Sequence, residues 1–182
     1  MINREVIVGQ TRRWLEKVVI GLQLCPFAKR PYELDRVRLV VLDAGLEEVW
    51  LEQMVEELQR LEEMPRTELE TTLLIIPEGL ESFHDYLDFL EVAELLNSKL
   101  GYEGEFQIAS FHPNYQFAES PPHDLANFTN RSPFPMLHIL REESVSRAVE
   151  HFSSVDQIPA RNMALLRSFS PEKIQELFYD PS

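Results

Sequence analysis

The sequence predicts an α/β fold, with one domain over residues 1–182, a mixed four-stranded sheet and about six helices in two or three layers. Short apolar runs rich in β-branched residues alternate with longer segments in which apolar residues recur at helical spacing. Two consecutive β-α-β units favour parallel pairing through right-handed crossovers. We therefore expect three parallel strands and an antiparallel fourth, with helices packed on the sheet.

The chain begins with a helix that leads into the first strand. Apolar residues recur at helical spacing from Trp14 to Leu22, and Gly21 and Pro26 mark the end of that helix. Residues 37–42 form a short run rich in valine and leucine, which predicts a strand.

The middle of the chain continues the alternation of helix and strand. A second helix carries an apolar stripe over residues 51–61 and stops at Pro65. Residues 71–76 are almost all apolar or β-branched, which is typical of a central strand covered on both faces. A third helix follows over residues 83–96 and is closed by Gly101.

The last third of the chain contains two strands and the remaining helices. Residues 106–110 and 136–140 predict the third and fourth strands. A helix is expected near residues 142–152, and one or two more end the chain, with Ser170 and Pro171 as the N-cap and first helical position of the last one.

A long connection separates the third and fourth strands. Residues 111–134 read FHPNYQFAESPPHDLANFTNRSPF, and a loop of this length is usually either functional or disordered. Its five aromatic residues are costly to leave in water, and its four prolines reduce the entropy lost on ordering. We therefore expect a structured loop that holds polar groups in defined places.

Charge and composition exclude several classes of partner. The formal net charge of −14 repels nucleic-acid phosphates and anionic lipid. No apolar run approaches the roughly 20 residues that a membrane span needs. Trp14, Glu16 and Lys17 interrupt what would be the apolar part of a signal peptide, and one cysteine allows no internal disulfide. A cytoplasmic protein is the expectation. Its cations gather over residues 12–38, where a local anion site can exist despite the overall charge, so a small anionic metabolite is the expected partner.

The carboxyl edge of the sheet is where a ligand is expected. His112 directly follows the third strand, and Arg131 comes shortly before the fourth. A rigidly held arginine can bind a carboxylate or phosphate with two hydrogen bonds, although Arg131 can equally tie loop carbonyls together. Neutral hydrogen bonds to a ligand can come from neighbouring residues: Tyr115, Asn130 and Ser132.

The histidines allow more than one role. His112 is a candidate general acid–base group, anion contact or metal ligand, but it can also hydrogen-bond to the backbone of the long loop. His138 lies on the predicted fourth strand between Met136 and Leu140, which favours a satisfied core histidine over a ligand-binding one.

Cys25 is the only cysteine, in the run LCPFAKR. It is a candidate nucleophile or redox thiol if Lys29 and Arg30 point toward it, because nearby cations lower the pKa of a thiol. The alternative is a buried, inert cysteine packed beside Phe27. No metal site is predicted, since neither paired-cysteine nor paired-histidine spacing occurs. No glycine-rich phosphate motif is present, and the sequence identifies no cofactor.

Four segments together resemble one family. TRRWLEKVVIGLQLCPFAK, ETTLLIIP, IASFHPNYQFA and NFTNRSPFPMLHILRE are similar, in this order, to the bacterial domain-of-unknown-function family numbered 1415, and the likeness extends to the RN and LR pairs of residues 161–167. Gln23 replaces the asparagine typical of the family, and Phe134 replaces a common tyrosine. The resemblance implies a small cytoplasmic bacterial protein and no particular activity.

Three hypotheses about function follow. The first is an enzyme that acts on a small anionic metabolite, with His112 as acid–base group, Arg131 and Lys29 as anion contacts, and Cys25 as a possible nucleophile. The second is a non-catalytic ligand-binding or protein-interaction module that uses the long loop. The third is a thiol redox or metal-linked protein centred on Cys25.

Overall fold

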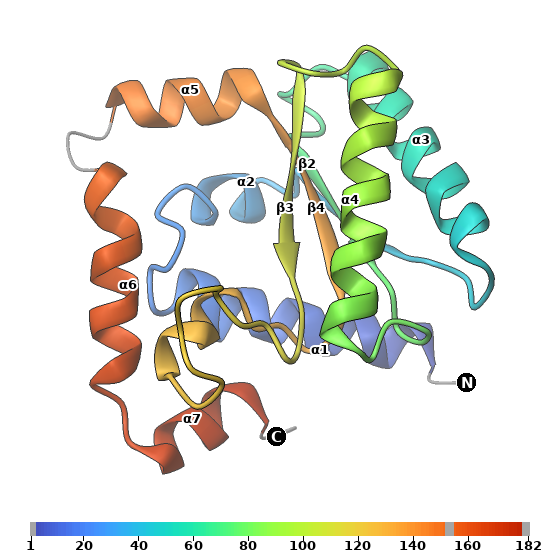
Figure 1. The fold of residues 1–182 in the computed structure, drawn as a ribbon. Coiled ribbons are helices and arrows are strands. Elements are labelled where there is room, and N and C mark those ends of the chain that lie inside the picture. Colours follow the sequence, from blue (N-terminus) through green and yellow to red (C-terminus); the bar gives the residue numbers. More distant parts are fainter. Residues whose placement is uncertain (1–2, 152–154, 180–182) are drawn as a thin grey trace.

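Helices and strands alternate along most of the chain in the computed structural model, which describes residues 3–151 and 155–179 (Figure 1). Phe152, the expected end of one helix, lies outside these residues. The elements are α1 (Arg4–Trp14), η1 (Leu15–Ile20), α2 (Lys29–Glu33), β1 (Val37–Val41), α3 (Glu47–Glu63), β2 (Thr71–Ile75), α4 (Phe83–Lys99), β3 (Phe106–Phe111), η2 (Leu125–Asn130), β4 (Met136–Arg141), α5 (Glu142–His151), η3 (Val155–Gln157), α6 (Ile158–Arg167) and α7 (Pro171–Phe178).

The four strands form one mixed sheet in the order β1-β2-β4-β3. β1 and β2 pair in parallel, and β4 pairs antiparallel with both β2 and β3. β1, β2 and β3 run in the same direction and β4 runs opposite, but the expected parallel pairing of three strands is wrong, because β4 lies between β2 and β3 and leaves only one parallel pair. Burial explains the order: β4 is apolar on both faces and half of its residues are buried, whereas β3 is mostly half-buried, as suits an edge strand.

The described residues contain more helices than the expected six. There are eight if the π-helical segment η1, which continues α1 without a break, is counted with the seven α-helices. The short helix α2 was not expected, because Pro31 follows Cys25 so closely. Pro31 lies in the first turn of α2, where its missing N–H has no partner to lose.

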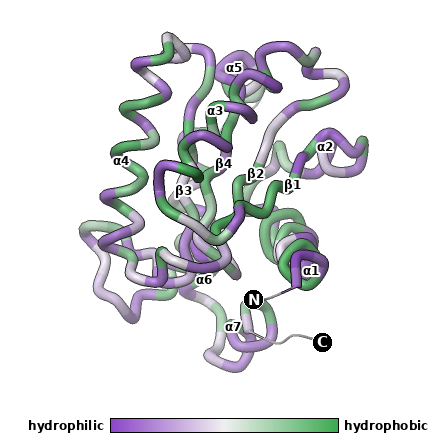
Figure 2. The backbone as a smooth tube through the Cα atoms, turned by 90° about the vertical axis from the view of Figure 1, so that its right-hand side faces the viewer, coloured by the Kyte–Doolittle hydropathy of each residue, from purple (hydrophilic) through white to green (hydrophobic). Residues whose placement is uncertain are grey.

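Helices cover both faces of the sheet, so the fold has three layers (Figures 1 and 2). α3 and α4 pack on one face, against residues such as Leu74 and Ile139. α1 and η1, with α6 and α7, pack on the other face, against Leu73 and Ile75. All five residues of β2 are buried, which confirms the prediction of a central strand covered on both sides.

The connection between β3 and β4, residues 112–135, extends from the carboxyl end of β3 and lies beside α6 and α7 (Figure 1). We refer to it as the 112–135 loop. It contains the 3-10 helix η2, and η2 packs against α6. In the described part of the chain, no helix combines the length and the apolar character that crossing a bilayer requires.

Candidate functional site

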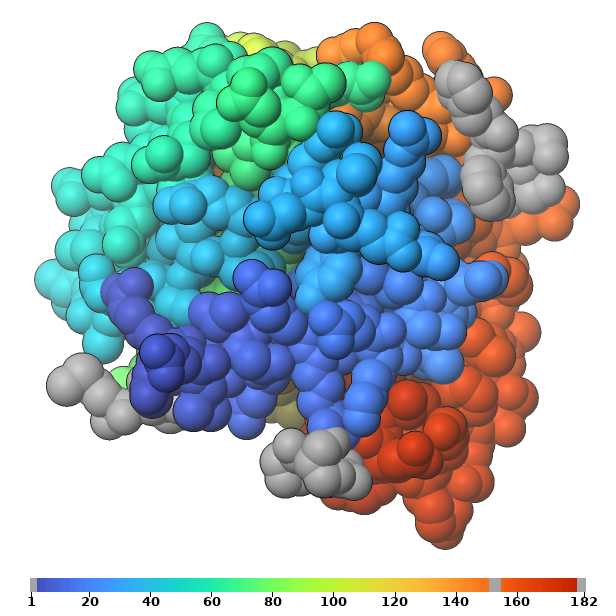
Figure 3. Space-filling view, turned by 180° about the vertical axis from the view of Figure 1, so that it is seen from behind, coloured from blue at the N-terminus to red at the C-terminus, as the bar shows by residue number. Residues whose placement is uncertain are grey.

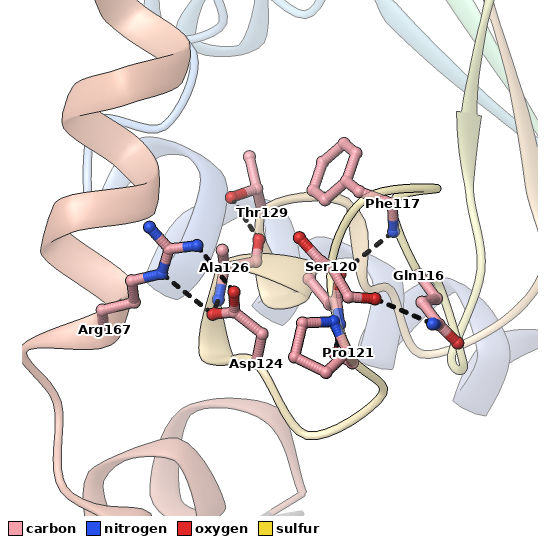
Figure 4. Close-up of polar contacts among 9 residues, drawn as sticks. Gln116, Phe117, Ser120, Pro121, Asp124, Ala126, Thr129 and Arg167 are labelled. Atoms are coloured by element: carbon pink, nitrogen blue, oxygen red, sulfur yellow. Dashed lines mark hydrogen bonds and ion pairs between the residues drawn. The ribbon is translucent and has the colours of Figure 1, made fainter.

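The 112–135 loop is held in shape by its own side chains (Figure 4). Asn127 is buried; its Oδ1 accepts the backbone N–H of Phe117 at 3.0 Å, and its Nδ2 donates to the Pro121 carbonyl at 2.9 Å. Gln116 Nε2 donates to the Ser120 carbonyl at 2.8 Å. These bonds satisfy backbone groups that a loop cannot pair in a ladder, so the loop is ordered, as its aromatic and proline content indicated.

Asp124 joins the loop to α6. Its Oδ1 accepts from the Ala126 N–H at 2.9 Å and caps η2, while both oxygens receive hydrogen bonds from the Arg167 guanidinium at 3.0 and 2.6 Å (Figure 4). The Arg167 hydrogen bonds lower the pKa of Asp124 to about 2. The stabilisation from this pair is therefore present above the unfolded-chain pKa of 3.8 and is lost as the pH falls toward 2.

Replacing Asp124 with asparagine removes the charge that Arg167 binds. We expect faster amide hydrogen exchange in residues 115–130 and near the end of α6 at pH 7, with the core strands unchanged, because this pair joins the loop to the helix. Hydrogen exchange followed by mass spectrometry measures the change. Glu176→Gln, which breaks the exposed Lys173–Glu176 pair on α7, is the control; equal exchange in both variants would contradict the assigned role.

His112 is fully buried at the end of β3, and both of its ring nitrogens are hydrogen-bonded. Nδ1 accepts the N–H of Asn114 at 2.9 Å, so Nε2 carries the proton and donates to the Leu80 carbonyl at 2.8 Å. The ring centroid lies 5.2 Å from that of Phe83 and 5.1 Å from that of Tyr86. Burial lowers the pKa of His112, which keeps the imidazole neutral. This is the geometry of a histidine that braces loop backbone.

His138 lies on β4 and faces β2. Its Nε2 is 2.7 Å from Thr71 Oγ1, and the Thr71 hydroxyl itself donates to the Ile139 carbonyl, so Nε2 is the protonated nitrogen. Burial lowers the pKa of His138 to about 4. The side chain is thus a half-buried, neutral histidine that is oriented by Thr71 within the sheet.

Cys25 lies in the turn after η1, and α6 holds that turn in place. Asn162 Nδ2 donates to the Leu24 carbonyl at 2.7 Å, and Arg161 donates to the carbonyl of Gln23, which has a positive φ of 54°. Arg161 and Asn162, the RN pair of the family resemblance, therefore brace the turn that contains Cys25. Within the described residues, no hydrogen bond or ring contact joins Cys25 to His112, and burial raises the pKa of the thiol.

The Cys25 thiol should react slowly with Ellman's reagent. Because only the thiolate attacks the reagent and burial disfavours it, we expect a rate at pH 7.5 at least about tenfold below that of the same chain unfolded in urea. Absorbance at 412 nm during the reaction follows the rate. Equal rates in the folded and unfolded chains would show an accessible thiolate and would favour the thiol hypothesis.

Arg131 is fixed at the end of the 112–135 loop. Its Nε donates to the Tyr115 carbonyl and its Nη2 to the Pro122 carbonyl, both at 3.2 Å, and its Cζ lies 4.2 Å from the centre of the Phe128 ring. Its own carbonyl accepts the indole N–H of Trp14 at 3.0 Å, which ties α1 to the loop. Arg131 therefore does tie loop carbonyls together, and three of its five N–H donors have no protein acceptor among the described residues.

Arg131 also borders a cleft of about 230 Å³ between three segments that are distant in sequence. We call it the α1–α7 cleft. Figure 3 shows α1 and α7 side by side on one face of the molecule. Pro113 lies two residues after the end of β3 and Pro133 three residues before the start of β4, so the cleft lies at the sheet edge where a ligand was expected. Its lining consists of Gln10, Arg13, Trp14, Pro113, Phe128, Arg131, Ser132, Pro133, Leu177, Phe178 and Tyr179.

The lining of the α1–α7 cleft is positively charged, although the protein as a whole is strongly acidic. Arg13 and Arg131 both border it, and the described residues contribute no carboxylate to it. Neither arginine has an ion-pair partner among the described residues. Two guanidinium groups without a carboxylate partner, next to aromatic rings, favour an anion over a cation at this place.

The other expected site residues are spread over the fold. Ser132 borders the cleft, but its hydroxyl donates to the Phe134 carbonyl at 2.6 Å. Tyr115 contributes its carbonyl to Arg131, and Asn130 binds the Ser110 carbonyl at 3.1 Å. Lys29 is exposed on α2 and pairs with Glu33 at 3.7 Å. Of the expected ligand contacts, the cleft therefore brings together only Arg131 and Ser132.

Sequence reasoning missed most of the cleft. Arg13 belongs to a group of cations near the N-terminus, but nothing in the sequence shows which side of α1 faces the 112–135 loop. Phe178 and Tyr179 come from the far end of the chain. The one sequence feature that could have indicated the cleft was the pair Arg13–Trp14, a cation beside an aromatic residue.

A second cavity, of about 200 Å³, lies between α1, α2 and β1 and has a different character. Arg12 borders it together with the carboxylates Glu16 and Asp35, so its lining carries one positive charge against two negative ones. Tyr32 donates to Glu16 Oε1 at 2.6 Å, and burial together with this bond raises the pKa of Tyr32 to about 12. Nor do three or more His, Cys, Asp or Glu side chains gather in a metal-binding arrangement within residues 3–151 and 155–179.

Comparison with known proteins gives one match. A family model described as "Protein of unknown function (DUF1415)" matches residues 6–176, nearly the whole chain. The same comparison found no curated protein and no solved structure that matches the chain.

Proposed function

The chain belongs to the DUF1415 family of proteins of unknown function, and we propose that it binds a small anionic molecule in the α1–α7 cleft. The observation that carries this proposal is the pair Arg13 and Arg131, which border one cleft without a carboxylate from the described residues. In a chain of net charge −14, two arginines that border one cleft without a carboxylate make a local positive site, which a bound anion would neutralise.

The Arg131 side chain is preorganised for such a ligand. Two loop carbonyls and the Phe128 ring fix the guanidinium, so little side-chain entropy is lost when an anion binds. Trp14 fixes the backbone of Arg131 in turn. In this proposal, the well-ordered 112–135 loop serves to hold the Arg131 guanidinium at the cleft.

Binding without turnover fits the cleft better than catalysis. The described residues contribute no Asp, Glu, His, Cys or Lys to its lining. Its hydroxyl groups belong to Ser132, which donates to the Phe134 carbonyl, and to Tyr179, and the lining offers neither of them a base that would activate it. His112, the acid–base candidate of the enzyme hypothesis, has both nitrogens bound to backbone groups. We therefore prefer the ligand-binding alternative, with His112 as a brace.

The substitution Arg13→Gln tests the proposal. We expect about tenfold weaker binding of small carboxylates, because one charge-assisted hydrogen bond in a partly exposed site contributes on the order of 1.5 kcal/mol. The fluorescence of Trp14, which borders the cleft, reports binding, while the buried Trp50 lies in the core on the opposite face of the sheet. Isothermal titration calorimetry gives the dissociation constants.

Arg12→Gln is the matched control, since Arg12 is the neighbour of Arg13 and borders the second cavity instead. It removes the same charge from α1 and should leave binding within about twofold. An equal loss of affinity in both variants would mean that only the overall positive charge of α1 matters. The proposal would be overturned if the unaltered protein bound none of the carboxylates.

We also propose a cellular location for the protein and exclude two classes of binding partner. We place the protein in the bacterial cytoplasm, because the family resemblance implies it and a single, partly buried cysteine suits a reducing compartment. The net charge of −14 argues against nucleic acid and anionic membranes as partners.

A further inference from the structure

Aromatic side chains form much of the wall of the α1–α7 cleft. Phe128 is at the centre of this wall; its ring centroid lies 4.8 Å from that of Phe178 and 6.3 Å from that of Tyr179, both edge to face. Trp14 comes from α1, and its only donor is already bound to the Arg131 carbonyl. Trp14 and Phe128 are largely buried, and Arg131 covers one face of Phe128, so Phe178 and the exposed Tyr179 present most of the ring surface that can attract another planar ring.

Several polar donors border the same cleft. Arg131 lies over Phe128 and keeps three of its five N–H donors unpaired among the described residues. Arg13 adds a second guanidinium, and Gln10 adds a neutral amide from the same helix. These donors match carboxylate oxygens, which accept from a guanidinium fork in the plane of the carboxylate.

The size of the cleft limits the ligand. The cleft has a volume of about 230 Å³. This is below the ~300–1,000 Å³ of sites for drug-sized ligands and cofactors. A nucleotide is too large to be enclosed, whereas one six-membered ring with a short carboxylate side chain fits.

Resting on the proposed function, we infer that the anion is an arene carboxylate, a single aromatic ring that carries one carboxylate on a short chain. The ring packs among Phe128, Phe178 and Tyr179, and the carboxylate lies toward Arg13 and Arg131. The aromatic wall sets the preference for a ring, and the two arginines set the preference for the charge.

Four probes separate the contributions of ring and charge. They are 3-phenylpropanoate, 3-cyclohexylpropanoate, 3-phenylpropan-1-ol and inorganic phosphate, titrated into the full chain by calorimetry. We expect 3-phenylpropanoate to bind about five- to tenfold more tightly than its cyclohexyl counterpart, which has the same charge and a similar size but no π face. The neutral alcohol and phosphate should each bind at least about tenfold more weakly than 3-phenylpropanoate.

The outcomes distinguish this inference from the proposed function. If the cyclohexyl compound or phosphate binds as tightly as 3-phenylpropanoate, the arene assignment is overturned while anion binding stands. If the neutral alcohol binds as tightly, the role of the carboxylate is overturned. If none of the four binds, the arene assignment fails, and the proposed function fails with it only if no other small carboxylate binds to the unaltered protein.

Tyr179→Leu tests the aromatic wall directly. Tyr179 is 54 % exposed, so this change should not unfold the protein. We expect about threefold to fivefold weaker binding of 3-phenylpropanoate, unchanged binding of the cyclohexyl compound, and smaller upfield shifts of the ligand ring protons in NMR spectra. Tyr32→Leu, at the second cavity, is the matched control. Equal losses for both ligands in Tyr179→Leu would overturn the assignment.

Discussion

Replacing His112 with alanine is expected to lower the free energy of unfolding by about 3–5 kcal/mol. The imidazole is fully buried between Phe83 and Tyr86, so its removal leaves a cavity. It also leaves the Leu80 carbonyl and the Asn114 N–H without their partner. Urea unfolding followed by circular dichroism measures the loss.

A control and a second variant make the role of His112 testable. His84→Ala removes an exposed histidine from α4 and should change the unfolding free energy by less than about 0.5 kcal/mol. His112→Asn keeps an acceptor near Nδ1 and should recover part of the loss. A decrease below about 1 kcal/mol in His112→Ala would contradict the bracing role and would return His112 to the catalytic candidates.

The second large effect is a loss of stability in mild acid. His138 has a pKa of about 4 in the folded protein against 6.5 in the unfolded chain. As the pH falls below 6.5, the unfolded chain gains a proton that folded His138 does not take up until about pH 4. The stabilisation from the neutral form is therefore complete above pH 6.5, and about 3 kcal/mol of it is lost by pH 4. His112 shifts in the same direction.

Urea unfolding at pH 7.0 and pH 4.5 measures this effect. The difference in unfolding free energy between the two pH values should be about 2 kcal/mol smaller in His138→Gln than in the unaltered protein. His84→Gln, at an exposed position, should leave the difference unchanged. If His138→Gln shows the full difference, a group other than His138 causes the acid sensitivity.

The helices and strands could largely be predicted, because apolar periodicity depends on residues that are near one another in sequence. The order of the strands could not, since nothing local shows that β4 lies between β2 and β3. That position follows from pairing across long stretches of chain, such as Leu73 with His138. The short helix α2 was missed because proline was read as a barrier although it occupies the first turn.

For the candidate site, the sequence alone predicted an ordered loop before the fourth strand, and it predicted Arg131 near the carboxyl edge of the sheet on the condition that this strand is antiparallel. Only the tertiary structure decided what surrounds Arg131 there, because other segments contribute to its surroundings: the Trp14 indole of α1 binds its carbonyl, and Phe178 and Tyr179 from the end of the chain border the same cleft. It likewise placed His112 against the Leu80 carbonyl, 32 residues earlier. The chemical role of a side chain depends on what surrounds it in space, and a sequence pattern records only what surrounds it along the chain.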